Sequence, residues 1–289
     1  SFRLSYPAGT FSSSGTIVAT IEVDGDGSFN AERQLFDVQE TIASLDFQVN
    51  GNSKGSLDLD VISGVPDREF GDGDHDFIYL PITAADGNVW LNNNLGANYA
   101  NMNHAQFNPV QQATAVNDHH AYGSLYQWGR YSDGHELINY TSATTGTGVN
   151  GSTSTKATTD TPGHDDFITI STSPGDWRIP QNDNLWQGEA GINNPCPQGY
   201  RLPTIAEYNA LTAAEGITND TTATNSILAF ATRGASRSAL SASVFQTILR
   251  YWSSSVDITY AKLYQWDSTI SPYYSNRRAY GYSVRCIQD

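Results

Sequence analysis

The last stretch of the chain, residues 251–289, constrains the fold most strongly. Two segments with strand character, residues 251–255 and 281–286, enclose a segment rich in Tyr, Ser, Thr, Asp and Asn. A core strand would alternate apolar and polar residues or consist of Val, Ile and Leu, and the enclosed segment does neither. The pattern therefore predicts two framework strands that hold a segment of different character between them.

Composition allows two interpretations of this segment. Seven of the sixteen tyrosines of the chain lie in residues 251–289. Tyr and Trp provide large, rigid contact area at low entropic cost, and Ser, Asn and Asp add adaptable hydrogen bonds, which is typical of a binding surface. Tyrosine is also common on the half-exposed faces of ordinary sheets. Composition alone does not decide between these interpretations.

The overall composition favours short strands and loops. Hydrophobic residues make up 38% and charged residues 16% of the chain, and Gly, Ser, Thr and Asn replace them, which argues against a helical bundle. No run of eighteen apolar residues occurs, so no membrane insertion is expected. The net charge is −15, with −19 in residues 1–232 and +4 in residues 233–289. An acidic body disfavours nucleic acid as a partner, whereas the positive tail suits a partly acidic ligand.

Residues 1–80 have the pattern of a small all-β domain. Turn residues separate its alternating segments, which points to a sandwich-like spacer with 14 acidic and 4 basic residues. The expected strands are residues 2–6, 16–23, 41–49 and 56–62. The remaining residues, 81–289, form the second predicted domain.

Two acidic turns resemble the start of a calcium loop. The bidentate glutamate of an EF-hand loop would fall at position 83 for the second turn, where Thr83 stands. We therefore expect solvated acidic turns, with residues 72–76 as the hinge before the second domain, and no cofactor; calcium is not supported by a convincing ligand set. The acidic residues of the two turns are Asp24, Asp26, Asp72, Asp74 and Asp76.

Two helices are expected in the second domain. One covers residues 121–130, with Asp118 near its start, and the other begins with a capping box formed by Thr204 and Glu207. Ile205, Tyr208 and Leu211 share one face of the second helix, which should pack on the C-terminal sheet. A Thr/Ser/Gly-rich tract at residues 141–173 is expected to be a long surface loop.

Neither the histidines nor the cysteines indicate a metal site. Adjacent histidines such as His119 and His120 point in different directions and rarely bind one metal ion, so no metal ligands are assigned. Cys196 and Cys286 are the only cysteines and are far apart in sequence. They form either one long-range disulfide or two buried thiols.

Three blocks in the second domain resemble a known family. They are residues 86–90 through 125–130, the Cys-Pro-Gln-Gly-Tyr-Arg-Leu-Pro-Thr run in residues 193–204, and Tyr-Trp-Ser-Ser-Ser at 251–255 closing at 281–286. Their order resembles the bacterial "major paralogous" surface domains, which have C-type lectin-like folds of the formylglycine-generating-enzyme type. Variable proteins of diversity-generating retroelements use the same fold. The resemblance covers roughly residues 82–289.

The resemblance implies a fold and a set of contact residues. It implies an α+β fold, with a loop-rich C-type lectin-like domain at 81–289 after the β domain at 1–80, and a disulfide between Cys196 and Cys286. In variable proteins, diversified positions near the C-terminus bind the ligand. The corresponding positions here are Arg237, Ser238, Ser241, Ser243, Arg250, Asp257, Tyr260, Tyr264, Tyr273, Tyr274, Ser275, Asn276, Arg278 and Tyr280. Adenine-directed rewriting of codons that end in C cannot give Lys, Gln or Trp, so Lys262, Gln265 and Trp266 either are scaffold or argue against diversification.

Catalysis is not expected from the sequence. The sulfatase-modifying relatives use paired reactive cysteines in one active site, and this chain has one cysteine before a helix and one in its last strand. No Gly-x-Ser-x-Gly, His-Glu-x-x-His or phosphate-binding glycine loop occurs. Glu207 is needed for its helix cap, and Asp165, Asp166 and Asp176 are loop acids without a spaced partner.

These observations lead to a functional hypothesis and an alternative. The first is a non-enzymatic receptor-recognition or attachment protein, the variable protein of a diversity-generating retroelement, on a cell or virion surface. Its partner would be a protein or glycan on a target surface. The alternative is a structural surface or pilus-like adhesin subunit without sequence diversification.

Overall fold

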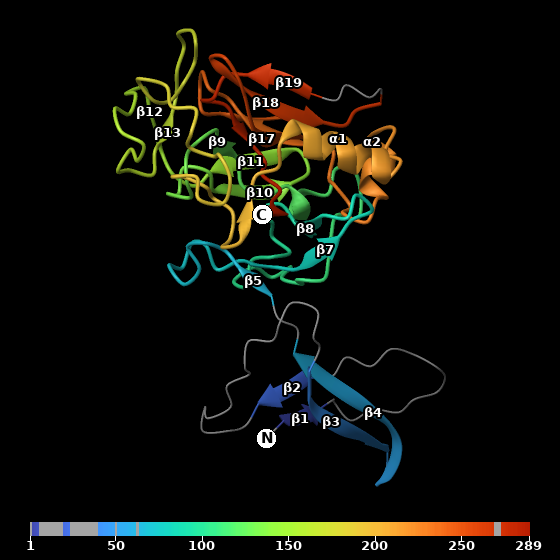
Figure 1. Cartoon of the computed structure of the whole chain (residues 1–289). Coiled ribbons are helices and arrows are strands. Elements are labelled where there is room, and N and C mark those ends of the chain that lie inside the picture. Colours follow the sequence, from blue (N-terminus) through green and yellow to red (C-terminus); the bar gives the residue numbers. More distant parts are fainter. Residues whose placement is uncertain (1, 6–19, 24–39, 50, 62–63, 269–272) are drawn as a thin grey trace. The chain divides into compact units, whose positions relative to one another are not determined.

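The computed structural model describes residues 2–5, 20–23, 40–49, 51–61, 64–268 and 273–289 (Figure 1). The chain divides into two compact units, Ser1–Ser63 and Gly64–Asp289. The sequence placed the domain boundary after residue 80. Residues 64–80 contribute β5 (Val65–Pro66) and β6 (Ile78–Tyr79), which pair with each other inside the second unit. The acidic segment 72–76 therefore connects two paired strands of that unit.

The described part of the first unit consists of two antiparallel strand pairs. β1 (Phe2–Ser5) pairs with β2 (Thr20–Val23), and β3 (Glu40–Val49) pairs with β4 (Asn52–Val61). Gly51, with φ of 77°, lies in the turn between β3 and β4, where a left-handed backbone conformation favours glycine. The strands predicted at 41–49 and 56–62 are confirmed. The acidic turn at Asp24 and Asp26 lies outside the described residues.

The second unit contains several small sheets. Two have four strands, in the orders β14–β21–β8–β7 and β16–β15–β20–β9, and one has three strands, β17–β18–β19. The pairs β10–β11 and β12–β13 lie within the Thr/Ser/Gly-rich tract and its approach, so the predicted loop is partly strand. The further strands of this unit are β7 (Pro81–Thr83), β8 (Val89–Leu91), β9 (Tyr126–Gln127), β10 (Ile138–Ser142), β11 (Thr145–Gly148), β12 (Ser152–Thr153), β13 (Phe167–Ile168), β14 (Tyr200–Arg201), β15 (Arg233–Arg237), β16 (Val244–Ile248), β17 (Arg250–Asp257), β18 (Tyr260–Gln265), β19 (Tyr273–Asn276), β20 (Gly281–Tyr282) and β21 (Ile287–Gln288).

The predicted α+β class is wrong, because the chain is mainly β and rich in loops. Strands account for 33% of the residues, and the described part contains two short α-helices, α1 (Ile205–Ala214) and α2 (Asp220–Thr224). The helix expected at residues 121–130 is absent from this described segment. A 3₁₀ turn at His119–Ala121 with Asp118 as N-cap is followed by Gly123 at φ 73°, which stops helical propagation. A Cβ at Gly123 would lie 2.3 Å from the Leu95 carbonyl oxygen, so the chain requires glycine there.

The capped helix is confirmed. The Thr204 side chain accepts a hydrogen bond from the Glu207 backbone N–H, and the Glu207 carboxylate accepts one from the Thr204 N–H. The predicted face of α1, including Tyr208 and Leu211, is buried, and the Tyr208 ring stacks on Tyr264 of β18 with centroids 5.1 Å apart. The helix therefore covers the C-terminal sheet, as its pattern predicted.

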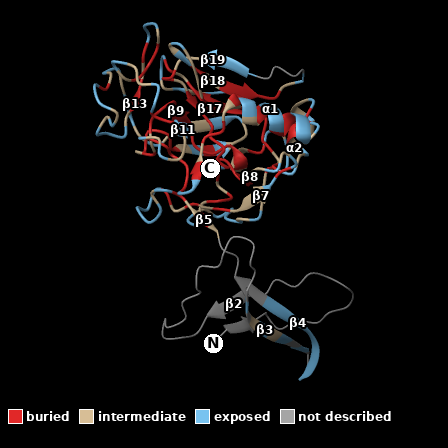
Figure 2. Ribbon diagram, viewed as in Figure 1, coloured by how far each residue is buried: buried red, intermediate tan, exposed pale blue. Residues whose placement is uncertain are grey.

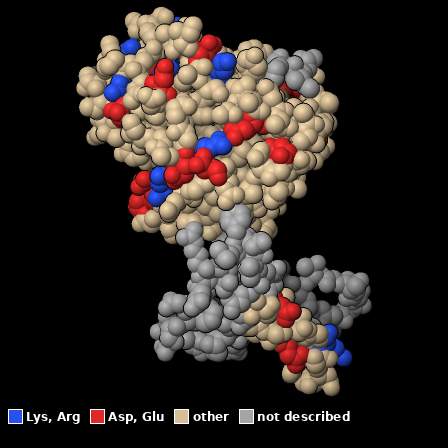
Figure 3. Space-filling view, in the orientation of Figure 1, with Lys and Arg blue, Asp and Glu red and all other residues tan. Residues whose placement is uncertain are grey.

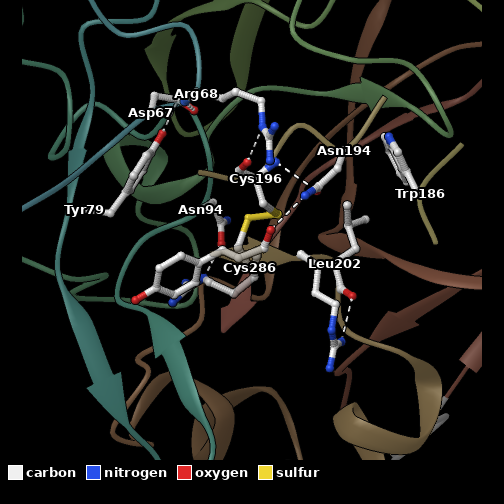
Figure 4. The surroundings of a disulfide bond; sticks show 12 residues. Asp67, Arg68, Tyr79, Asn94, Trp186, Asn194, Cys196, Leu202 and Cys286 are labelled. Carbon is white, nitrogen blue, oxygen red and sulfur yellow. Dashed lines mark hydrogen bonds between the residues drawn. A yellow bond between two sulfur atoms is a disulfide. The ribbon is translucent and has the colours of Figure 1, made fainter. Parts of the chain in front are cut away.

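Cys196 and Cys286 form a disulfide with a Cα–Cα distance of 5.9 Å across 90 residues of sequence (Figure 4). A cross-link over a loop of this length removes about 4 kcal/mol of chain entropy from the unfolded state. The Arg68 Nε donates to the Cys196 carbonyl at 2.8 Å, so the start of the second unit is attached at the same place. Both half-cystines are fully buried among aromatic residues, including Trp186 and Trp252. The disulfide thus fixes the last strand against the Cys-Pro-Gln-Gly run.

No helix among the described residues is both long and apolar enough to cross a membrane.

Candidate binding surface

The Tyr-rich segment lies on the three-stranded sheet β17–β18–β19. The central strand β18 pairs antiparallel with both neighbours, with Tyr251 opposite Tyr264 and Tyr264 opposite Tyr273. The first framework segment forms most of β17 and is buried from Tyr251 to Ser254. The second forms β20 only at Gly281–Tyr282 and continues as buried irregular chain to β21. In Figure 2 the outer strand β19 is exposed, whereas much of β17 and β18 is buried.

The structure divides the predicted contact residues by exposure. Three lie in the core, five are half-buried and six are exposed. The exposed members are Ser241, Ser243, Tyr260, Tyr273, Tyr274 and Ser275. The half-buried members are Ser238, Arg250, Asp257, Asn276 and Tyr280, and the buried members are Arg237, Tyr264 and Arg278.

The assignment of Tyr264 to a contact surface needs correction. Tyr264 is 1% exposed, stacks on Tyr208 of α1, and lies 5.1 Å from the Trp266 ring, centroid to centroid. Burial raises the pKa of its hydroxyl, as expected for a phenol that is removed from water. Tyr264 is therefore part of the core beneath α1. The scaffold prediction for Gln265 and Trp266 agrees with their burial.

Arg237 and Arg278 are also structural. The Arg237 guanidinium lies over the Phe167 ring at 4.3 Å and donates to the His135 carbonyl at 2.7 Å, and burial lowers its pKa to about 10. Arg278 lies over the Trp128 ring at 4.5 Å and forms an ion pair with Asp183. Both side chains are about 2% exposed or less, so neither can meet a ligand without rearrangement of the core.

The remaining predicted residues belong to two different sheets. The turn that contains Ser238, Ser241 and Ser243 joins β15 to β16 and hydrogen-bonds to itself, with the Ser241 and Ser243 hydroxyls 2.8 Å apart. Its neighbour is the segment at Ile170, whose N–H donates to the Ala239 carbonyl. The other exposed residues lie on β17–β19. The structure therefore does not place the serine turn and the tyrosines in one sheet.

Specific contacts hold three half-buried residues, Arg250 at the start of β17, Asn276 at the end of β19, and Tyr280. The Arg250 guanidinium lies 5.6 Å from the Tyr282 ring centroid, and its Nε donates to Gln265 Oε1 at 3.1 Å. The Asn276 amide donates to the Tyr282 hydroxyl at 2.7 Å, and the Tyr280 ring stacks on Tyr282 at 5.7 Å. These contacts join β17 and β19 to Tyr282 of β20, so we assign a supporting role to Arg250, Asn276 and Tyr280.

Ile258 is an exposed residue that the sequence interpretation missed. It is 86% exposed and has φ of 54°, in the two-residue turn that connects Asp257 of β17 to Tyr260 of β18. A β-branched residue in the left-handed region is a strained outlier, which costs about 1–3 kcal/mol. Sequence reasoning could have found it, because a two-residue hairpin turn normally contains Gly, Asn or Asp and this one contains Ile-Thr.

Replacing Ile258 with glycine is expected to stabilise the second unit by about 1 kcal/mol, because the removed strain exceeds the entropy that glycine adds to the unfolded chain. The measurement is the denaturant midpoint, followed by tryptophan fluorescence, since all six tryptophans lie in residues 64–289. Ile192→Gly is the control, because Ile192 is also exposed, at 64%, and has ordinary φ. The Ile192→Gly variant should be slightly less stable than the wild type. A loss of stability in Ile258→Gly would show that the turn is unstrained.

A buried cluster of Asp133, His135 and Glu136 has the composition of a metal site, but its ligand atoms are already used. His135 Nε2 accepts from the Gln127 N–H, and its Nδ1 lies 2.6 Å from Asp133. Glu136 accepts from His75 and from the Gly134 N–H. The cluster is therefore best explained as a buried structural network.

The acidic turn at residues 72–76 is likewise used locally. Asp72 accepts from the backbone N–H groups of Asp74 and His75, and Asp76 accepts from the Gly71 N–H. These carboxylates shape the loop. On the face of the protein shown in Figure 3, acidic and basic side chains lie next to one another.

No protein-family model matches this chain, and neither a curated protein nor a solved structure matches it.

Proposed function

We propose that this protein binds a macromolecular ligand through side chains of the β17–β18 hairpin and β19, which we call the tip surface. Its exposed members are Ile258, Tyr260, Tyr273, Tyr274 and Ser275, and its half-buried members are Asp257 and Lys262. One observation carries the proposal: four large apolar or aromatic side chains of this sheet and its hairpin turn are exposed, whereas Tyr251, Leu263 and Tyr264 of the same sheet are buried. Their exposed fractions are 86% for Ile258, 36% for Tyr260, 47% for Tyr273 and 46% for Tyr274.

The polar members of the tip surface support this proposal. Lys262 Nζ lies 5.3 Å from the Tyr273 ring centroid, and the Ser275 hydroxyl donates to Asp257 across β18. Ordered aromatic groups with a polar rim are typical of contact surfaces, in which a few aromatic anchors contribute most of the binding energy. Strain at Ile258 points in the same direction, since strained residues concentrate at functional sites.

The sequence resemblance to variable proteins of diversity-generating retroelements supports a more specific version. In that version the ligand is a protein or glycan on a target surface, and the exposed tip positions are the diversified ones. We expect the neighbouring DNA to contain a near-repeat of the C-terminal coding segment beside a reverse transcriptase gene. Differences at adenines should fall in the codons for Asp257, Tyr260, Tyr273 and Tyr274 and spare that for Trp266. A DNA neighbourhood without such a repeat would contradict diversification.

Binding itself is tested with the intact chain on a glycan array and a protein array. We expect the array signal of the triple variant Tyr260→Ser, Tyr273→Ser, Tyr274→Ser to be at least tenfold lower than that of the wild type. Its unfolding midpoint should be unchanged. Tyr131→Ser is the control, because Tyr131 is a half-buried tyrosine outside the sheet, and this variant should keep binding. Equal signals from wild type and triple variant would overturn the proposal.

The alternative of a structural subunit is favoured by one observation. Within the described residues β19 pairs only with β18, so it is an edge strand that could accept a strand from another copy. Light scattering after size-exclusion chromatography distinguishes the two functions. Ordered assembly of the wild type that the triple variant abolishes, without any signal on the arrays, would favour the structural subunit.

A further inference from the structure

A second candidate site lies in the same unit, in a cavity of about 240 Å³ formed by loops and by β10. None of its lining residues belongs to β17, β18 or β19. The β5–β6 loop, the chain after β8, and β10 with the residue after β11 each contribute part of the wall. The residues that the argument uses are Asp74, Phe77, Asn101, His104, Ser124 and Asn139.

Several polar groups on the cavity wall have no hydrogen-bond partner within the described residues. The carboxylate of Asp74 and the amide of Asn139 accept or donate no side-chain hydrogen bond there, and both residues are exposed. The Asn101 Oδ1 accepts from the Asn103 N–H, which leaves its NH₂ group to donate. These groups together offer both acceptors and donors to a molecule in the cavity.

His104 adds a donor of defined tautomer. Its Nδ1 accepts a hydrogen bond from the Gln106 backbone N–H at 3.1 Å. In the neutral ring the proton must then lie on Nε2, because one nitrogen accepts and the other donates. His104 is half-buried and lines the cavity, so its Nε2–H is a donor with little freedom to rotate away.

The floor of the cavity is apolar apart from one hydroxyl. Phe77 and Leu137 are buried and supply apolar surface, and Ser124 is also buried, at 3% exposure. A Cβ at Gly96 would lie 2.0 Å from the Ser124 hydroxyl oxygen, so glycine is required for the chain to pass this close. A ligand that fits must therefore combine an apolar face with several hydrogen-bonding groups.

The charge and size of the cavity narrow the ligand class. Its lining, as far as the structure describes it, contains one carboxylate and no Lys or Arg, which disfavours phosphates and carboxylates. The volume is below the roughly 300 Å³ at which pockets for drug-sized ligands begin, so one ring fits better than two. Sugars have hydroxyls that suit the Asp74 carboxylate and the amides, and C–H faces that suit Phe77.

We propose that this cavity binds a small neutral polyhydroxylated ligand of monosaccharide size. The proposal does not depend on the function of the tip surface. Asp74 accepts hydrogen bonds from ligand hydroxyls, and Asn101 and His104 donate hydrogen bonds to ligand oxygens. The Asn139 side chain accepts through its amide oxygen or donates through its NH₂ group. The buried apolar floor contacts the C–H groups of the ring.

The test uses the full chain and saturation-transfer NMR with glucose, galactose, mannose and N-acetylglucosamine. At least one of these is expected to bind, and glucose 6-phosphate and glucuronic acid to bind at least tenfold more weakly. Asp74→Ala should lower the affinity for the sugar tenfold or more, which is the effect of losing a hydrogen bond to a charged group. Asn139→Ala and His104→Ala should weaken it several-fold.

Matched controls keep the test independent of folding. Asp165→Ala and Asn184→Ala change exposed residues of the same types outside the cavity and should leave binding unchanged. The fold of each variant is checked by its tryptophan-fluorescence unfolding midpoint. The proposal is overturned if no neutral sugar binds, if the cavity variants bind as well as the controls, or if choline binds in place of the sugars with the same dependence on Asp74.

Discussion

Replacing Tyr264 with alanine is expected to destabilise the second unit by about 3–5 kcal/mol, the usual cost of deleting a buried aromatic ring. The substitution removes the ring that stacks on Tyr208 and contacts Trp266, so α1 loses part of the surface on which it packs. The measurement is the free energy of unfolding from guanidinium titration, followed by tryptophan fluorescence. Trp266 lies beside the substituted ring, so the native signal should change as well.

Tyr273→Ala is the matched control, because Tyr273 is the direct cross-strand partner of Tyr264 on β19. At 47% exposure its removal should change the free energy of unfolding by less than about 0.5–1 kcal/mol. Equal losses in the two variants would mean that the tip surface is core. A negligible loss for Tyr264→Ala would mean that α1 does not cover the sheet.

Glu136→Gln is expected to destabilise the second unit by about 3–5 kcal/mol, the cost of removing one partner from a buried ion pair. Glu136 is fully buried, and its Oε1 lies 2.8 Å from His75 Nε2. Burial opposes ionisation of Glu136, but hydrogen bonds from His135 and His75 outweigh it and hold the pKa of Glu136 well below its usual range. Burial similarly opposes the charge on His75, yet Glu136 and Asp72 raise its pKa to about 10.

The pH dependence of the free energy of unfolding follows from the raised pKa of His75 and the lowered pKa of Glu136. The raised pKa of His75 means that its contribution to stability is complete below about 6.5 and is lost as pH rises toward about 10. The lowered pKa of Glu136 means that its contribution is present above 4.5 and is lost as pH falls. The wild type should therefore lose stability between pH 6.5 and 10, and Glu136→Gln should show a much smaller loss in this window.

Glu189→Gln provides the control for the buried pair. Glu189 pairs with Arg68 at 3.3 Å, but both side chains are about a third exposed, and such pairs contribute roughly 0–1 kcal/mol. Unfolding free energies measured by urea titration at pH 5.5 and pH 9.5 compare the three proteins. If Glu136→Gln kept the wild-type stability and pH profile, His75 would have to be neutral in the folded protein.

The positively charged segment 233–289 shows why a net charge counted from the sequence predicts the charge of the protein surface poorly. Three of its arginines, Arg237, Arg278 and Arg285, are at most 2% exposed. Arg285 donates to the carbonyls of Leu91, Asn92 and Leu228 and lies over the Phe230 ring at 4.5 Å, without a carboxylate partner in its contacts. Arg237 donates to backbone carbonyls as Arg285 does, and Arg278 forms an ion pair with Asp183. The net charge of residues 233–289 therefore does not describe an anion-binding face.

The sequence by itself determined the local elements whose causes are local. The cap of α1 follows from Thr204 and Glu207, the turn at Gly51 from its backbone freedom, and the strand pattern of β3 and β4 from alternation. It also located the Tyr-rich segment between two buried framework segments. The α+β class is wrong because it was inferred from a family resemblance. The helix expected at residues 121–130 does not form, because the glycines of this segment favour turns and a short strand.

Only the tertiary structure decided which tyrosines meet water. Tyr264 and Tyr273 face each other across one strand pair, yet α1 covers Tyr264 and leaves Tyr273 exposed. Exposure depends on which distant segment packs over each position, and that packing is not encoded in the residue or its neighbours. The same holds for the cavity beside Asp74, since its walls are chain segments that come together only in the folded protein.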